Sequence, residues 1–313
     1  NTIPSLVREA FRIAEEEKPG PVLLELPEDI AEEAADMVDL IPPGERYYAV
    51  AGIEVIKIAA NAIKNAKHPL LLIGAGANRK EARRAISEFI GSIGVPFCNT
   101  QMGKGVVDES SSYFLGTAAL SDKDYLHDYI QAADLIVNIG HDVVEKPPFF
   151  MEHGSTKVIH INYKSAQVDQ VYFPQTEVVG DIALSVDALA DALGSRLKLD
   201  LQDFEKVRDN VKAKIFQLDE EPVFPMRPPN IVSEIRNLMG YHDIIALDNG
   251  VYKIWFARNY PAFQPNTILL DNALATMGAG LPSAMLAAMI YPNRKVMSIC
   301  GDGGFMMNSQ EIE

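Results

Sequence analysis

Apolar and polar positions along the chain follow two patterns, one typical of helices and one typical of buried strands. Apolar residues at helical spacing predict helices at 52–65 and 79–91. Short and almost continuous apolar runs predict buried strands, which lie at 68–74, 95–98, 134–140, 157–162 and 177–181. Because such strands alternate with helices, we predict an α/β fold, with a Rossmann-like, doubly wound parallel sheet over residues 51–193.

The segments on either side of this region predict further elements. Before it, the pattern predicts a helix at 5–18, a short strand at 21–27 and a polar linker that reaches Tyr48. After it, a charged helical stretch at 195–220 leads to a cluster of prolines. Beyond the prolines, a helix at 231–239 and strands at 243–248 and 295–300 predict a second α/β domain. We therefore divide the chain into 1–30, 31–50 (linker), 51–193, 194–228 (linker helix) and 229–313.

Size and charge restrict the class of protein. A chain of 313 residues fits about two domains. Its 28 basic and 43 acidic residues give a formal charge of −15, which argues against nucleic acid or an anionic membrane as a partner. No apolar run reaches the roughly 18 residues of a membrane span, and no signal peptide is visible. Cys98 and Cys300 lie in or beside apolar strands and predict buried thiols in a reducing cytoplasm.

The sequence starts directly in a helical pattern and stops inside a helix that has just begun. The chain begins without methionine and stops at Glu313, just after a helical segment has started. We therefore expect it to be an internal part of a longer protein, and its second α/β domain to be truncated.

The run Gly301-Asp302-Gly303-Gly304 is the most informative motif. It joins the strand predicted at 295–300 to a helix-compatible segment. Glycine amides beside a helix N-terminus suit a diphosphate, because unpaired N–H groups and the positive end of the helix dipole face the anion. The Asp302 carboxylate is placed where a cation such as Mg²⁺ could bridge protein and phosphate oxygens. The alternative is a tight turn in which Asp302 caps the helix.

A second motif upstream adds to the first. It reads Asp271-Asn272-Ala273-Leu274-Ala275-Thr276-Met277-Gly278-Ala279-Gly280-Leu281-Pro282-Ser283-Ala284. Together the two motifs resemble the diphosphate-binding domain of thiamine-diphosphate enzymes, and most closely the acetolactate synthase (acetohydroxyacid synthase) large subunits. The resemblance extends over roughly the whole chain. It implies that 1–30 is the tail of a pyrimidine-binding domain, and that 229–313 is the first part of an incomplete thiamine-diphosphate-binding α/β domain.

The resemblance implies roles for the loops of this second domain. It makes Asp302 a Mg²⁺ ligand and assigns phosphate contacts to backbone amides. The implied cofactor-binding residues are Asn249, Gly250, Val251, Tyr252, Ala275, Met277, Gly301, Asp302, Gly303 and Gly304. The family usually carries a Gln-His pair where Val251 and Tyr252 stand here, so the Tyr252 hydroxyl is a candidate substitute for the imidazole. Asn308 is too close to Asp302 to be the family's next metal ligand, and we expect it to pack in the helix.

Met277 is the residue to which the resemblance gives a catalytic role. Family members wedge one bulky apolar side chain beneath the cofactor, which brings the aminopyrimidine amine close to C2 of the thiazolium ring. Met277 matches this wedge, and a flexible thioether suits an irregular contact. The Ala275 carbonyl and the Met277 amide are implied to bond to the aminopyrimidine, although most relatives have glycine at the Ala275 position. The alternative is an ordinary core methionine.

Other groupings of residues carry weaker signals. Gly74-Ala75-Gly76 hints at a dinucleotide fingerprint but lacks its third glycine, which favours a tight turn. The biosynthetic members of the family, which carry FAD, share a Gly-Ala-Arg-Phe-Asp-Asp-Arg segment. Gly140–Pro147 here differs from that segment, which argues against FAD binding. Six histidines show no metal-ligand spacing, which favours histidines that are on the surface or satisfied within the protein. The alternative is that the loop 143–154, with His141 and His153 beside it, faces a cofactor cleft.

The resemblance implies a transferase that joins 2-keto acids. With thiamine diphosphate and Mg²⁺, such a carboligase converts pyruvate to 2-acetolactate with loss of CO₂, a reaction of branched-chain amino acid biosynthesis. It also implies a homodimer or homotetramer with the active site at a subunit interface, so the 313 residues alone are expected to be inactive. Two alternatives remain: another thiamine-diphosphate decarboxylase, lyase or acetyltransferase, and a non-catalytic nucleotide-binding regulatory protein.

Overall fold

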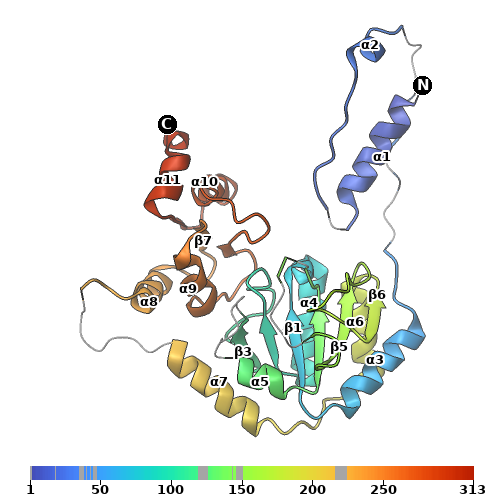
Figure 1. Ribbon diagram of the computed structural model, residues 1–313, viewed down its shortest axis with the longest axis vertical. Helices are drawn as coiled ribbons and strands as arrows, with labels where there is room; N and C mark the ends of the chain where they lie inside the picture. The colour runs from blue at the N-terminus through green and yellow to red at the C-terminus, as the bar shows by residue number, and fades with distance from the viewer. Residues whose placement is uncertain are drawn as a thin grey trace. The chain divides into compact units, whose positions relative to one another are not determined.

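A computed structural model describes residues 2–17, 19–34, 39, 41–42, 44, 48–118, 126–142, 144–145, 151–215 and 224–313. The chain forms two compact units, Asn1–Ala49 and Val50–Glu313 (Figure 1).

The first unit is small and mostly exposed. It holds helices α1 (Ile3–Glu15) and α2 (Glu28–Ala31), the second of which lies partly in the predicted linker. The predicted strand at 21–27 is wrong, because these residues have no regular secondary structure. A strand forms only where a neighbouring strand accepts and donates its backbone hydrogen bonds, and the ladders found in the described residues lie in the second unit.

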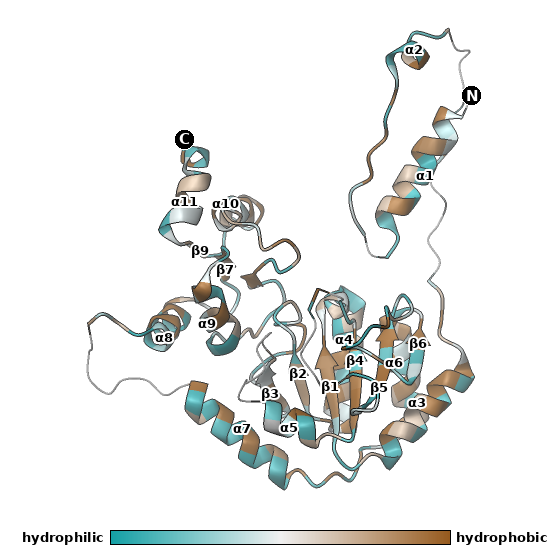
Figure 2. Cartoon of the chain, viewed as in Figure 1, coloured by the Kyte–Doolittle hydropathy of each residue, from teal (hydrophilic) through white to brown (hydrophobic). Residues whose placement is uncertain are grey.

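The second unit contains a six-stranded parallel sheet. Its strands are β1 (Pro69–Ile73), β2 (Phe97–Asn99), β3 (Phe114–Thr117), β4 (Leu135–Ile139), β5 (Lys157–Asn162) and β6 (Thr176–Val179). They lie in the order β3-β2-β1-β4-β5-β6, as the labels in Figure 2 show, which is the strand order of a Rossmann fold. This confirms the predicted fold class. Strand β3 was not predicted, because its four residues include a glycine and give too short an apolar pattern.

Helices cover both faces of this sheet. Helices α3 (Ile53–Asn65), α4 (Lys80–Ile93) and α6 (Ile182–Leu193) form one layer, and α5 (His127–Ala132) and α7 (Gln202–Ile215) form the other. Alternate residues of β1 enter the two cores, Leu71 on the first side and Leu70 on the second. Figure 2 shows the strands as mainly hydrophobic and α3 and α7 as mixed. Of the helix predicted at 195–220, residues 216–220 lie outside the described part.

A smaller parallel sheet follows. Its strands β7 (Ile244–Leu247), β8 (Ile268–Leu269) and β9 (Val296–Ile299) lie in the order β8-β7-β9. Helices α8 (Pro228–Leu238) and α9 (Val251–Asn259) share its main apolar core. Helix α10 (Gly280–Ile290) packs on β7 and β9, and its buried Ala284 and Ala287 allow a close approach. The short helix α11 (Asp302–Met307) follows β9.

The turn after β1 is tight because two backbones meet there. Gly76 donates its N–H to the Gly140 carbonyl at 2.9 Å, and a Cβ on Gly74 would lie 2.6 Å from the same oxygen. Close packing therefore accounts for Gly74 and Gly76 and supports the tight-turn interpretation. Of the segment Gly140–Pro147, residues 143, 146 and 147 lie outside the described part, as do 148–150 of the loop 143–154.

Three expectations from composition can be compared with the described residues. No helix among them is long and apolar enough to cross a membrane. Cys98 and Cys300 are not joined by a disulfide; Cys98 is buried as predicted, whereas Cys300 is only partly buried. His160 is buried and bonded to Tyr172 and to the Lys164 carbonyl, as expected for a histidine satisfied within the protein.

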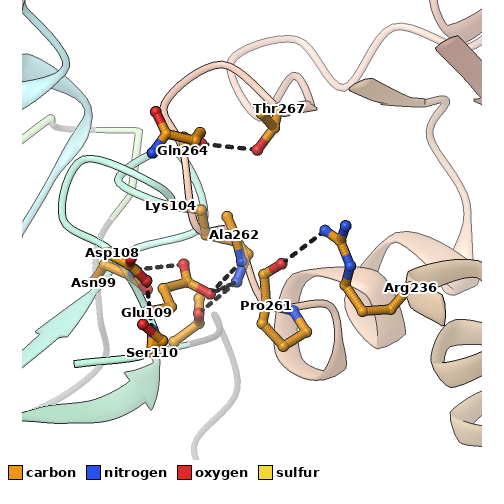
Figure 3. Close-up of polar contacts among 11 residues, drawn as sticks. Asn99, Lys104, Asp108, Glu109, Ser110, Arg236, Pro261, Ala262, Gln264 and Thr267 are labelled. Carbon is orange, nitrogen blue, oxygen red and sulfur yellow. Dashed lines mark hydrogen bonds and ion pairs between the residues drawn. The ribbon is translucent and has the colours of Figure 1, made fainter. Parts of the chain in front are cut away.

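A buried ion pair joins the loops of the two sheets (Figure 3). The Glu109 carboxylate accepts from Lys104 Nζ, from Asn99 Nδ2 and from the Ala262 amide, each at 2.9 Å. Lys104 and Glu109 are only 4% and 6% exposed. Ala262 precedes β8, so this carboxylate holds the segment that leads into the smaller sheet. Every oxygen of Glu109 has a donor, which offsets the cost of burying the charge.

Replacing Lys104 with methionine should destabilise the protein strongly. The Glu109 charge would stay buried without its cation, which typically costs about 3 kcal/mol of unfolding free energy. Urea-induced unfolding, followed by circular dichroism, measures this loss.

The matched control is Lys206→Met on α7. Lys206 forms a surface ion pair with Asp203 and its side chain is 72% exposed, so the change should stay within about 0.5 kcal/mol. Equal losses in the two variants would contradict the assigned role of the buried pair.

Candidate functional site

The site lies where three loops leave the smaller sheet. Strands β8, β7 and β9 are parallel neighbours, so the segments that follow them emerge at one edge. These segments are 248–250, 270–279 and 300–301. They contain the first residues of the predicted loop 249–252 and of both motifs, which continue into the helices that follow. Ligands of open α/β sheets bind at this carboxyl edge. The structure thus brings together the regions that the sequence marked separately.

Asp248 ties these loops to one another. It follows β7 directly and is fully buried. Its carboxylate accepts from the Gly278 amide at 2.9 and 3.0 Å and from the Asn249 amide at 2.7 Å. The first of these bonds fixes the second motif against the end of the central strand. The hydrogen bonds also compensate for the burial of a carboxylate.

The glycines of both motifs make room for this residue. A Cβ on Gly280 would lie 2.7 Å from the Asp248 Cβ, and a Cβ on Gly304 would overlap its Oδ2 atom. Gly278 has φ +84°, and its carbonyl accepts from Asn308 Nδ2 at 2.7 Å. Asn308 therefore makes a structural contact, but it lies just after α11 and not within the helix as predicted. By contrast, Gly303 is exposed and has open space around it.

Tyr252 links the first loop to the Gly-Asp-Gly-Gly turn. Its hydroxyl oxygen accepts from the Gly301 amide at 3.1 Å, and its ring packs beside Gly250, where a Cβ would overlap it. Burial raises the pKa of Tyr252, so the phenol stays protonated and its O–H hydrogen can still be donated. Trp255, one turn along α9, packs against the core of this sheet and is a structural aromatic.

Polar side chains beneath the second motif form a chain of hydrogen bonds. Lys253 Nζ donates to Asn249 Oδ1, Asn272 Oδ1 and the Asp271 carbonyl, each at 2.7 Å. Asn272 Nδ2 donates in turn to the buried Glu145 carboxylate at 2.9 Å. Burial raises the pKa of Glu145 and lowers that of Lys253. These hydrogen bonds connect the loop of the second motif to the region of the larger sheet.

Several of the predicted contact residues are exposed on the same loops, whereas Gly304 is buried. Met277 is 50% exposed and Leu274 is 88% exposed, so neither belongs to a core of the described chain. Asp302 is exposed at the first residue of α11. Val251, the first residue of α9, is exposed as well. The first amides of a helix have no partner within the helix, which leaves N–H groups of α9 and α11 available to an anion.

Ala275 adopts an unusual backbone conformation. Its φ of +48° lies in the left-handed region, which costs a residue with a Cβ about 1–2 kcal/mol. The segment around it is held at Asp271 and Thr276 by hydrogen bonds from Lys253 and Asn249. The strain thus falls on the residue whose carbonyl the resemblance assigns to the cofactor.

The geometry suits a divalent cation only in part. Asp302 offers one exposed carboxylate beside a glycine turn, as a site shared with phosphate oxygens requires. Among the residues that the structure describes, no group of three or more His, Cys, Asp and Glu side chains could hold a metal ion. The residues present therefore fit a cation that takes most of its ligands from a bound phosphate and water, not a cage built by these residues.

Several residues of this site were not predicted. They are Asp248, Lys253, Asn272 and Glu145. A charged residue that ends a buried strand, as Asp248 does, was a usable signal. The contact between Glu145 and Asn272 had no signal in the sequence, because 127 positions separate the two residues.

Two family models match the chain. Residues 56–189 match "Thiamine pyrophosphate enzyme, central domain", and residues 248–313 match "Thiamine pyrophosphate enzyme, C-terminal TPP binding domain". The second span begins at Asp248 and contains both motifs.

Curated proteins with similar sequences carry related names. An acetolactate synthase of Bacillus subtilis is 28% identical over 99% of this chain and 55% of its own length. A catabolic acetolactate synthase of Raoultella terrigena is 31% identical over 100% of this chain and 57% of its own length. The large subunit of acetolactate synthase isozyme 2 of Escherichia coli is 27% identical over 99% and 56%. The chain spans just over half the length of these relatives.

Replacing Ala275 with glycine should stabilise the protein. Glycine removes the left-handed strain of about 1–2 kcal/mol but adds roughly 0.5–1 kcal/mol of unfolded-state entropy, so we expect a gain near 0.5–1 kcal/mol. Thermal and urea unfolding measure it. The same change at exposed Ala288 in α10 should instead cost about 1 kcal/mol. A loss of stability at both positions would contradict the backbone strain assigned to Ala275.

Glu145→Gln should change how stability depends on pH. In the unfolded chain a glutamate titrates near about 4.3, whereas burial raises the pKa of Glu145 in the folded protein. Its contribution is therefore fully present below the unfolded pKa and is lost as pH rises through the folded value. The unfolding free energy of Glu145→Gln, relative to that of the parent protein, should therefore increase from pH 4 to pH 8.

Urea unfolding at several pH values checks this expectation. Glu54→Gln, on the exposed side of α3, controls for the loss of one negative charge. The same pH trend in both variants would show that Glu145 has no special contribution.

Proposed function

We propose that this chain, which belongs to the thiamine pyrophosphate enzyme family, is part of an enzyme that converts pyruvate to 2-acetolactate with loss of CO₂. The observation that carries the proposal is the convergence of both motifs on Asp248 at one sheet edge, with Asp302 and Met277 left exposed. Similarity to acetolactate synthases over almost the whole chain supports the choice of reaction.

The glycine turn and the first loop would hold the diphosphate end of the cofactor. We assign Mg²⁺ to the Asp302 carboxylate and phosphate oxygens to the Gly303 and Gly304 amides. The Gly301 amide already donates to Tyr252, so Gly301 shapes the turn. On the neighbouring loop, Gly250 and exposed Val251 follow the same edge of the sheet, and Tyr252 offers its O–H hydrogen.

The second motif would hold the other end. We propose that the Ala275 carbonyl and the Met277 amide would bind the aminopyrimidine, and that the Met277 side chain would support the cofactor. Asn249 contributes by holding Thr276, since its side-chain amide donates to that carbonyl at 2.8 Å. When bound, thiamine diphosphate supplies the carbanion chemistry by which one 2-keto acid loses CO₂ and joins another. The loops would orient it.

The remaining parts of the proposal concern the whole protein. We propose a cytoplasmic homodimer or homotetramer with its active site at a subunit interface, acting on small 2-keto acids and without FAD. The domain boundaries 1–30, 51–193 and 229–313 also belong to the proposal. The spans of the two family models, 56–189 and 248–313, support the last two.

Asp302→Asn tests the proposal in the full-length protein. The parent should form acetolactate from pyruvate when thiamine diphosphate and Mg²⁺ are present. The variant should bind the cofactor with Mg²⁺ at least about 100-fold more weakly, because even groups that only support a metal ligand contribute 10–100-fold. Calorimetric titration and a colorimetric acetolactate assay measure the two effects, and exposed Asp191→Asn on α6 is the control.

Three results would revise the proposal in different ways. Turnover of another keto acid, with none of pyruvate, would overturn the reaction and keep the cofactor. Normal Mg²⁺-dependent binding by the variant would remove Asp302 from the metal site. A parent protein that binds no thiamine diphosphate would leave the regulatory nucleotide-binding alternative.

A further inference from the structure

Lys253 stands beneath the second motif with all its hydrogen bonds in use. An ammonium group has three donors and no acceptor. Its three partners are Asn249 Oδ1, Asn272 Oδ1 and the Asp271 carbonyl, each 2.7 Å away. No donor is left for a substrate carboxylate or a phosphate. The arrangement therefore favours a role in holding the loops over a role in binding ligand.

Asn272 extends these contacts to the larger sheet. Its amide oxygen accepts from Lys253, and its amide nitrogen donates to Glu145 Oε1 at 2.9 Å. The amide oxygen faces a donor and the amide nitrogen faces an acceptor. Only one of the two flipped orientations of the Asn272 amide therefore satisfies both partners. Glu145 is 2% exposed and is itself held by the Thr100 hydroxyl and by the Met102 amide at 2.7 Å.

Asn249 fixes the far end of the same loop. Its amide oxygen accepts from Lys253, and its amide nitrogen donates to the Thr276 carbonyl. The segment 271–276 is thus fastened at Asp271 and Asn272 on one side and at Thr276 on the other. Between these points lies Ala275 in its left-handed conformation, two residues before Met277.

We infer that Lys253 is a positioning residue for the 271–277 loop, and that Glu145 of the larger sheet region holds the same loop through Asn272. The larger domain then helps to shape the cofactor-binding loop before any cofactor is present. That this loop serves catalysis rests on the proposed function. That Lys253 and Glu145 order the loop rests on the contacts alone.

Lys253→Met tests the inference in the full-length protein. The variant keeps the length of the side chain and removes all three donors. Without cofactor, we expect the backbone amides of 273–277 to exchange hydrogen at least 10-fold faster, as measured by mass spectrometry. The affinity for thiamine diphosphate should fall about 10- to 100-fold, the range found for residues that orient ligands, with a smaller change in kcat at saturating cofactor.

Two comparisons separate positioning from a general loss of stability. Lys295→Met removes an exposed lysine that donates to a single carbonyl, that of Leu238, and it should leave both measurements unchanged. Glu145→Leu should speed exchange of the same loop, and Glu145→Gln should do so less, because glutamine can still accept from Met102 and Asn272.

The outcomes are distinct. The inference would be overturned if the backbone amides of 273–277 in Lys253→Met exchanged hydrogen at the same rate as in the parent. It would also be overturned if exchange became faster evenly over the second unit. Faster loop exchange with an unchanged affinity for thiamine diphosphate would also overturn it, since the loop order would not serve the cofactor. If the parent binds no thiamine diphosphate at all, the proposed function fails, and the exchange data still decide whether Lys253 orders the loop.

Discussion

The contact between Asp248 and the two glycine motifs is the constraint on which the site depends. A buried carboxylate is stable only where donors surround it, and here the donors are backbone amides of its own loop and of Gly278. The side chain fits because Gly280 and Gly304 present no Cβ to it. Glycines of both motifs therefore serve packing around one residue, and this requirement sets the distance between the two loops.

Buried carboxylates also connect the two sheets of the second unit. Glu109 accepts from the amide of Ala262, which precedes β8, and Glu145 accepts from Asn272, which follows β8. Both glutamates come from the larger sheet region, and both hold the segments that flank the same short edge strand. A two-residue strand has few ladder hydrogen bonds of its own. Contacts from the neighbouring domain replace them, so the larger domain acts as a template for the loop after β8.

The sequence predicted those elements whose cause is local. The apolar run at 157–162 corresponds to β5, Lys157–Asn162, because a buried central strand carries its pattern within itself. The segment 21–27 has a similar pattern but no strand, since pairing depends on residues elsewhere. In the site, the glycine turn and the exposed Met277 could be located from motifs. The partners of Lys253 and Glu145 could not, because their side chains meet residues that are distant in sequence, and the left-handed φ of Ala275 follows from that fastening.

The strain at Ala275 shows how these contacts are connected. A single residue gains about 1–2 kcal/mol by leaving the left-handed region, so this conformation persists only if its neighbours cannot move. Asp271 and Asn272 are held by Lys253, Thr276 is held by Asn249, and Gly278 is held by Asp248. Each of these bonds contributes roughly 1 kcal/mol, and together they exceed the strain. The loop therefore has its shape in the absence of a ligand, and a cofactor that binds to it does not have to supply the energy of ordering it.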